Sequence, residues 1–149
     1  MAGYSMTHIT RSVEIAAKPE AVYELVYKVE RFPLYSHFIK EVTKVGPNNY
    51  RWKAHINGLW FEWASAFVEK ERPGHISWRS VSGLESHGNY VISAIPGGTK
   101  VTFDIEYHLS SHFLETAVES ILSPLIEEAF LEILHNIKKE LELTPHRNV

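Results

Sequence analysis

The amino-acid sequence predicts an α+β domain in which a curved, seven-stranded antiparallel sheet wraps around a long C-terminal helix. Three observations predict this fold class. Segments with strand character follow one another at short intervals, a pair of short helices interrupts them once near the start, and a long apolar stripe of helical period comes last. A length of 149 residues fits one domain, which we expect to span residues 1–149 with its core at about 7–142.

The N-terminal segment predicts one strand and then two short helices. Residues His8–Ala16 alternate between apolar and polar side chains, which is the period of a strand. Pro19 suits the first turn of a helix, because its missing N–H costs nothing there, and residues 21–29 carry apolar side chains at helical spacing. The stretch Arg31–Tyr35 should break this helix, and we expect a second short helical turn after it.

Six further segments have strand character, and residues typical of turns separate them. Asn57-Gly58 is the clearest turn, since both residues accept the positive φ that a tight hairpin requires. Such short connections favour an antiparallel meander. The six segments are Phe38–Val45, Tyr50–Ile56, Leu59–Glu69, His75–Val81, Ser86–Ala94 and Thr99–His108.

A single amphipathic helix is predicted from His112 to about Glu142. At about 1.5 Å per residue it would be roughly 45 Å long, enough to lie across a seven-stranded sheet. Pro124 lies inside this segment and should kink the helix or separate its first turns.

Strand parity predicts which side chains face this helix. On the last strand the apolar residues alternate with polar ones, so Phe103 and Tyr107 should point inward. The segment Leu59–Glu69 is apolar on both faces, and we place Phe61, Trp63, Ser65 and Phe67 on the inner face. The opposite face, which includes Trp60, would then need a cover such as a dimer partner.

A sheet of this width curls, and one helix against its concave face cannot fill the enclosed space. The aromatic inner face is equally well explained by simple core packing. Hydroxyl groups on that face favour a cavity instead, because buried hydroxyls need partners that a ligand or bound water can supply. These hydroxyls belong to Tyr50, Ser65, Ser80, Tyr90 and Tyr107.

Composition argues against several classes of protein. A net charge of -3 does not suit a nucleic-acid binder, which needs a basic face. The absence of Cys excludes a disulfide framework and a thiol nucleophile, and fits a reducing compartment. No segment approaches the roughly 20 apolar residues of a membrane span, and the N-terminus lacks the apolar core of a signal peptide. We therefore expect a cytoplasmic protein, monomeric or weakly dimeric, with no nucleic-acid partner and no integral membrane segment.

The sequence offers no clear cofactor or catalytic motif. Its nine His residues are scattered, without a His-x-His or His-Glu-x-x-His motif, so we expect neither a metal nor another cofactor. Ser65 and Ser80 have no base that the sequence makes evident, which argues against a serine hydrolase.

Four stretches, together with the order of elements, resemble the START-like SRPBCC superfamily, and more narrowly its polyketide cyclase/dehydrase and coenzyme Q-binding branch. They are Ser12–Tyr23, Val29–Pro33, Ile76–Ser80 and Gly97–Thr102, and the resemblance extends over about residues 7–142. It implies a helix-grip fold with a deep cavity between the sheet and the long helix. It also implies relatives that bind lipids, quinones or polyketides, of which only some are catalysts.

Two positions depart from the pattern of the aromatase/cyclases in this superfamily. Those enzymes carry a cavity Trp followed four residues later by a catalytic Arg. Trp63 matches the Trp, but Phe67 stands at the position of the Arg, and Phe32 stands where those enzymes often have Trp. Such an Arg holds and polarises a polyketide carbonyl, so Phe67 puts that mechanism in doubt and makes the cavity more apolar.

We predict that the domain binds a hydrophobic small molecule (a polyketide, an isoprenoid quinone or a lipid) as a carrier or binding protein. The alternative is a polyketide aromatase/cyclase or dehydrase in which Tyr90, Tyr107, Ser65 or a nearby His moves protons. A third hypothesis is an adaptor that binds a partner through the outer face around Trp60. The residues expected to contact the ligand are Phe32, Tyr35, Trp52, Phe61, Trp63, Ser65, Phe67, Trp78, Ser80, Tyr90, Ile92, Phe103, Tyr107, Val118, Leu122 and Leu125.

Overall fold

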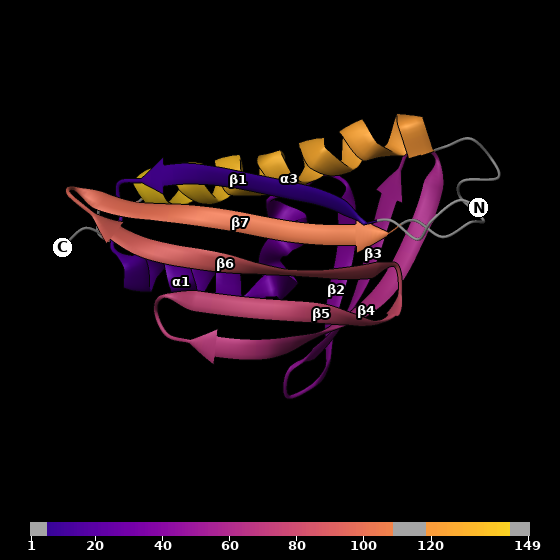
Figure 1. Ribbon diagram of the computed structural model, residues 1–149, viewed down its shortest axis with the longest axis horizontal. Helices are drawn as coiled ribbons and strands as arrows, with labels where there is room; N and C mark the ends of the chain where they lie inside the picture. Colours follow the sequence, from indigo (N-terminus) through magenta and orange to yellow (C-terminus); the bar gives the residue numbers. More distant parts are fainter. Residues whose placement is uncertain (1–5, 109–118, 144–149) are drawn as a thin grey trace.

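The computed structural model describes residues 6–108 and 119–143. Seven strands form one antiparallel sheet in the order β1-β7-β6-β5-β4-β3-β2, so all but β1 follow the order of a meander (Figure 1). Two short helices lie between β1 and β2, and a long helix ends the described chain, which confirms the predicted fold class. The elements are β1 Thr7–Ile15, α1 Pro19–Tyr27, the 3-10 helix η1 Val29–Leu34, β2 Ile39–Gly46, β3 Asn49–Ile56, β4 Leu59–Glu71, β5 His75–Gly83, β6 Glu85–Ile95, β7 Gly98–His108 and α3 Glu119–Glu142.

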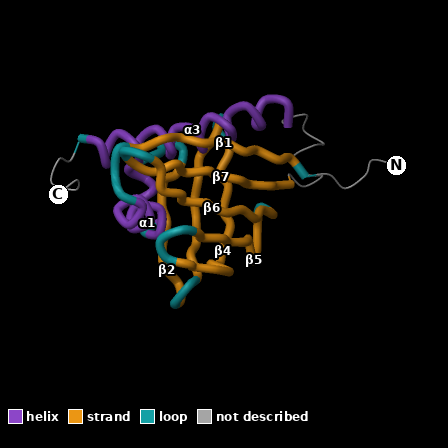
Figure 2. Tube along the Cα trace, turned by 60° about the vertical axis from the view of Figure 1, so that its left-hand side comes forward, coloured by secondary structure: helices purple, strands orange, loops and turns teal. Residues whose placement is uncertain are grey.

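The sheet is curled around its helices. Helix α3 contacts both β1, at one edge of the sheet, and β3, near the other edge. A flat sheet could not reach one helix from both sides, so the strands between must bend around it. Figure 2 shows α3 running along the β1 side of the curved sheet, with α1 near its end.

Two helical predictions need correction. The second short helix does not follow Arg31–Tyr35, because η1 begins at Val29 and contains Pro33. Helix α1 also ends earlier than predicted, at Tyr27. The first part of the predicted C-terminal helix lies outside the described residues, and from Glu119 onward the helix continues unbroken through Pro124.

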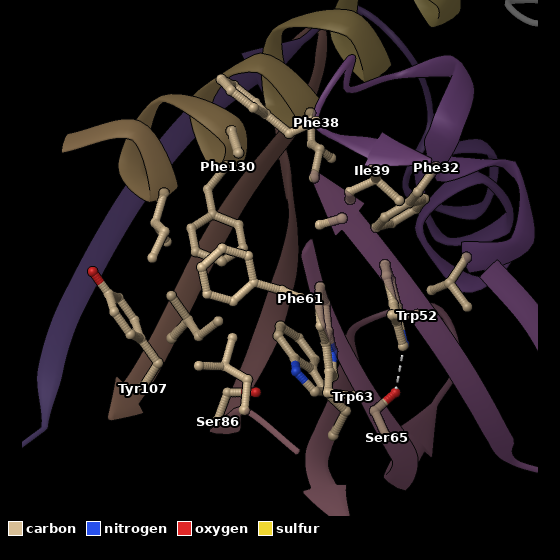
Figure 3. Close-up of a pocket in the computed structure, with 18 of the residues that line it drawn as sticks. Phe32, Phe38, Ile39, Trp52, Phe61, Trp63, Ser65, Ser86, Tyr107 and Phe130 are labelled. Atoms are coloured by element: carbon tan, nitrogen blue, oxygen red, sulfur yellow. Dashed lines mark hydrogen bonds between the residues drawn. The ribbon is translucent and has the colours of Figure 1, made fainter. Parts of the chain in front are cut away.

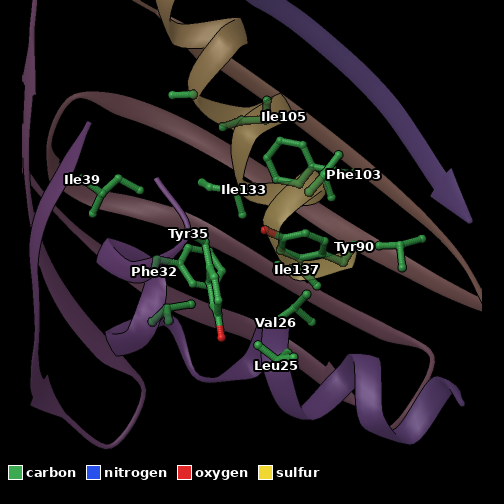
Figure 4. Packing of buried hydrophobic residues seen from close by; sticks show 14 of the residues in the cluster. Leu25, Val26, Phe32, Tyr35, Ile39, Tyr90, Phe103, Ile105, Ile133 and Ile137 are labelled. Carbon is green, nitrogen blue, oxygen red and sulfur yellow. The ribbon is translucent and has the colours of Figure 1, made fainter. Parts of the chain in front are cut away.

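The core lies between the concave face of the sheet and the apolar faces of α1 and α3 (Figure 4). Strand parity was correct for the last strand, since Phe103 and Tyr107 are 3% and 1% exposed. It was also correct for β4, where Trp60 points outward and is 60% exposed. Its indole ring stacks on the imidazole of His55 with ring centroids 4.5 Å apart, so part of its cover comes from the neighbouring strand.

Polar contacts fix α3 to the sheet edge along one flank. On the helix, the groups involved are the carboxylates of Glu127 and Glu142 and the ammonium group of Lys138. Each joins the helix to β1 or to the residue that follows it, so the contacts are spread along most of the described helix. They are Arg11 Nη2 to Glu127 Oε2 (2.6 Å), Lys138 Nζ to the carbonyl oxygen of Glu14 (2.6 Å) and the amide of Ala16 to Glu142 Oε2 (2.9 Å).

A second set of polar contacts holds the opposite flank of α3 against the segment that follows η1. Tyr35 takes part twice, because its carbonyl oxygen accepts a hydrogen bond from Asn136 (2.8 Å) and its hydroxyl donates one to Glu140 (3.1 Å). His37 Nδ1 lies 2.7 Å from a Glu132 oxygen, and its backbone N–H donates to the other oxygen of the same carboxylate. The helix is therefore supported along both sides.

No described helix is both long enough and apolar enough to cross a membrane.

Gly83, which ends β5, is expected to be intolerant of a side chain. Its φ is +80°, and an added Cβ would lie 2.4 Å from the carbonyl oxygen of Glu62. Gly58 has nearly the same φ, +79°, but nothing within 4 Å of the Cβ position. Gly58→Ala should cost about 1–2 kcal/mol of backbone strain, whereas Gly83→Ala should cost clearly more in urea denaturation. Equal losses would show that the close approach to β4 does not constrain Gly83.

The contact between α3 and β1 should also make stability depend on pH. Hydrogen bonds from Lys138 and from the amide of Ala16 hold the pKa of Glu142 below its ordinary value. A lowered pKa in the folded state stabilises the protein above the pKa of the unfolded state, and this contribution disappears as the pH falls through the folded value. In the Glu142→Gln variant, the melting temperature should therefore fall less between pH 5 and about pH 3 than it does in the wild-type protein. An unchanged acid profile would contradict this role for Glu142.

Candidate functional site

A cavity of about 110 Å³ lies between the concave face of the sheet and α3 (Figure 3). Its wall takes residues from both short helices, from all strands except β1, and from α3. Most of the predicted contact residues lie on this wall. They are Phe32, Trp52, Phe61, Trp63, Ser65, Phe67, Trp78, Tyr90, Phe103 and Tyr107.

Four predicted residues lie elsewhere. The backbone and hydroxyl of Tyr35 are engaged with α3, and Ser80 Oγ accepts a hydrogen bond from the amide of Ser86 (2.9 Å). Ile92 is buried beyond the cavity on β6, and Leu125 is half-buried on α3. The side chains of Val118 and Leu122 lie outside the described residues.

The prediction missed the residues that α3 contributes to the wall, although they belong to the apolar stripe of the predicted C-terminal helix. Ile126, Ala129, Phe130 and Ile133 reach the cavity from α3, which places it further along the helix than predicted. Periodicity identifies the face of a helix that is buried, but not how far the helix is displaced along the sheet. Further residues that were missed come from the short helices, from the start of β2 and the residue before it, and from the β5–β6 connection and the start of β6. They include Val26, Val29, Phe38, Ile39, Leu84 and Ser86.

Two stacked pairs of aromatic rings form part of the wall. Trp52 and Trp63 are opposite each other on β3 and β4, with ring centroids 5.5 Å apart and planes 9° from parallel. Trp78 and Phe103 stack with centroids 5.7 Å apart, and Phe130 of α3 lies 5.0 Å from Phe103. Offset stacking of this kind is favourable and fixes the orientation of each ring. The wall therefore presents ordered aromatic faces rather than flexible aliphatic chains.

The orientation of Trp78 depends on a glycine. Gly88 is directly opposite Trp78 on β6, and a Cβ at this position would lie 2.7 Å from Cζ2 of the indole ring. It would also lie 2.5 Å from the carbonyl oxygen of Asp104. Without a side chain at Gly88, the indole can lie close to the sheet, where it occupies less of the enclosed space.

The polar groups on the wall are few and uncharged. Ser65 Oγ accepts a hydrogen bond of 2.8 Å from the indole N–H of Trp52, which leaves its own O–H available as a donor. Burial raises the pKa of Tyr90 far above its ordinary value, and burial together with Tyr27 and Glu30 raises that of Tyr50. Both phenols therefore stay neutral near pH 7. They can donate a hydrogen bond but are poor bases.

Among the described residues on the wall, none carries an ionised side chain near pH 7. Phe67 occupies the position discussed above for the catalytic Arg, and its ring packs between Tyr27 and Tyr50 at centroid distances of 5.7 and 5.5 Å. The described wall thus lacks a charged group that could polarise a carbonyl, and it favours retention of an apolar molecule over acid–base chemistry.

One group of side chains that could hold a metal ion was not predicted. Glu69, Glu71 and His75 lie on the β4–β5 hairpin, with one ligand atom of each within 4.8 Å of the others. None of the three lines the cavity. His75 Nδ1 is 2.9 Å from Glu69 Oε1 and 3.7 Å from Glu71 Oε1, so these side chains already contact one another across the hairpin.

Comparisons with known proteins agree with this geometry. A family model described as "Polyketide cyclase / dehydrase and lipid transport" matches residues 6–142. Among solved structures, the protein TTHA0849 from Thermus thermophilus is similar at a TM-score of 0.80 and 20% identity, with 91% of this chain and 97% of that chain covered. No curated protein sequence matches the chain significantly.

Two other solved structures are also similar to the chain. A START superfamily protein from Mycobacterium smegmatis has a TM-score of 0.74 at 16% identity, over 91% of this chain and 97% of that chain. Zhui aromatase/cyclase from Streptomyces sp. R1128 has a TM-score of 0.75 at 16% identity, over 93% and 94%. At these identities, the likeness shows a shared START-like fold.

Ser65→Ala should leave the indole N–H of Trp52 without its acceptor. We expect the free energy of unfolding to fall by about 1–2 kcal/mol, the cost of an unpaired, partly buried donor. In a Trp52→Phe background the same substitution should cost less, because phenylalanine has no N–H to satisfy. Urea denaturation of the four proteins in this double-mutant cycle measures the difference, and an equal cost in both backgrounds would contradict the role of the hydrogen bond.

Proposed function

The chain belongs to the polyketide cyclase/dehydrase and lipid transport family, and from this premise we propose that it binds a hydrophobic small molecule with a ring-bearing body, as a carrier or binding protein. The observation that carries the proposal is a cavity with an aromatic wall and no charged side chain among the described residues that line it. Binding is favoured by roughly 25 cal/mol for each Å² of apolar ligand surface that such a wall shields from water.

The volume of the cavity limits what can enter without movement. About 110 Å³ is close to the roughly 150 Å³ of an engineered apolar cavity that binds benzene. Drug-sized ligands occupy roughly 300–1,000 Å³. One ring of a polyketide or of an isoprenoid quinone therefore fits as the cavity stands, and a larger part of either molecule requires wall side chains to move. The half-buried side chains of the wall are the candidates for such movement, and they are Trp52, Trp63, Phe67, Trp78, Leu84 and Phe130.

The stacked rings favour a planar ligand over a saturated lipid chain. A ring placed beside Trp78 or Phe103 can stack in the same offset manner as these two side chains do with each other. An aliphatic chain would be shielded from water equally well but would gain nothing from the orientation of the rings. An aromatic polyketide or a quinone head group thus suits the wall best.

Catalysis is the second candidate function, and the phenols are the groups that could support it. Tyr50 and Tyr90 keep their protons because burial raises the pKa of each. Each can donate a hydrogen bond to a substrate, but a raised pKa makes a phenol a weaker acid, and a phenol that keeps its proton cannot act as a base. Together with Phe67 in place of an Arg, this supports a carrier more strongly than an enzyme.

The neutral fluorophore N-phenyl-1-naphthylamine, which brightens in apolar surroundings, provides a test. Ala129 lines the cavity and is 7% exposed, so Ala129→Phe should place a benzene-sized group in the space that the ligand would use. We expect the Kd of the probe to rise about tenfold or more, equivalent to 1.4 kcal/mol or more of lost binding. Overpacking should cost about 1–3 kcal/mol of stability, which circular dichroism and thermal unfolding monitor.

Leu131→Phe is the matched control, since Leu131 is on the same helix but is 41% exposed and does not line the cavity. It should leave the Kd within about twofold of the wild-type value, as expected for a surface substitution away from the site. If the probe binds equally well to a folded Ala129→Phe variant, or does not bind the wild-type protein, the cavity is not the binding site that we propose.

A further inference from the structure

A lysine lies over the aromatic ring that closes one end of the cavity. Lys70 Nζ is 5.6 Å from the ring centroid of Phe67 and 5.2 Å from that of Tyr27. Phe67 lines the cavity and is only half-buried, so its ring separates the cavity from solvent at this end. The ammonium group is therefore close to the wall but remains in contact with water.

The rings at this end come from three different elements. Tyr27 belongs to α1, Tyr50 to β3 and Phe67 to β4, and Phe67 contacts both of the others. Phe67 and Tyr27 are both half-buried. A rotation of the Phe67 side chain would open the cavity toward Lys70 without moving the backbone of the sheet. This makes the Phe67 end a natural mouth for a ligand that is larger than one ring.

Within the part of the chain that the structure describes, no carboxylate forms an ion pair with Lys70. Its Nζ donates a hydrogen bond to Oδ1 of Asn48 (2.6 Å), which is a neutral acceptor. Arg72, two residues further along the chain, is different, because Glu20 and Glu24 of α1 both pair with its guanidinium group. The ammonium group of Lys70 is therefore free of an ion pair with any described carboxylate at this end of the cavity, although Glu30 is close enough to raise the pKa of Tyr50 there.

We propose that Lys70 selects ligands that carry an acidic group, with the ring-bearing body inside the cavity and the anion at Nζ. This inference rests on the proposed function and adds the chemical class of the ligand, an aromatic carboxylate or similar organic anion. A cavity without charges cannot hold the anion itself, because no partner there would offset the desolvation cost. At the mouth, the anion keeps part of its hydration and gains the ammonium group.

Two probes with the same ring body test this proposal. N-phenyl-1-naphthylamine is neutral, whereas 8-anilino-1-naphthalenesulfonate carries a sulfonate on the same anilinonaphthalene body. Lys70→Gln should raise the Kd of the anionic probe by about fivefold, as expected for one solvent-exposed charge pair. It should leave the Kd of the neutral probe within about twofold, and Lys70→Arg should preserve the affinity for both. The preference for the anionic probe should also shrink as salt is added.

Lys100→Gln removes the same charge from an exposed position on β7, opposite Glu14 of β1, and serves as the matched control. If this variant weakens the anionic probe as much as Lys70→Gln does, the effect belongs to the net charge and the proposal is overturned. If Lys70→Gln weakens both probes equally, Lys70 acts only by packing on the rings, which also overturns it. If the ratio of the two Kd values is unaltered in Lys70→Gln, only the role of Lys70 is overturned. If neither probe binds the wild-type protein, the proposed function itself is overturned.

Discussion

Polar contacts hold α3 along both of its flanks, and the cavity lies in the space between this helix and the sheet. Arg11 and Glu127 hold one flank to β1, while His37 and Glu132 hold the other to the segment after η1. A helix fixed along both sides cannot settle into the concave face of a sheet that curls far enough to touch it from β1 and from β3. Since close-packed interiors leave little empty space, the space that remains here follows from this support.

The same architecture explains why the wall is uncharged. Residues that face inward are shielded from water on the sheet side and under α3, and burial there raises the pKa of Tyr50 and Tyr90. An ionised group at these positions would lose its hydration without gaining a partner. The charges instead lie at the flanks of α3 and on the outer face of the sheet. The ion pairs that hold α3 in place thus lie apart from the uncharged wall of the cavity.

The sequence predicted the sheet and its inner face well, because alternation along a strand directly encodes which side chains point inward. Trp52, Trp63 and Phe67 were placed correctly for this reason. The helix contribution was predicted less well, and Phe130 was missed, because helical periodicity does not encode how far a helix is shifted along its partner. The contact between Glu69 and His75 was also missed, since a register shift between Phe67 and Glu69 alters the cross-strand neighbours. Such irregularities depend on tertiary packing.

The pairing of β1 with β7 has a consequence for biosynthesis. Residues Thr7–Ile15 pair with residues Thr99–Tyr107, so the first strand has no partner until nearly the whole sheet has left the ribosome. Helix α3, which roofs the cavity, is made later still. Contacts this distant in sequence form slowly. A nascent chain therefore exposes the aromatic lining before it can be covered, and a ligand or a chaperone that shields these rings would act at the last stage of folding.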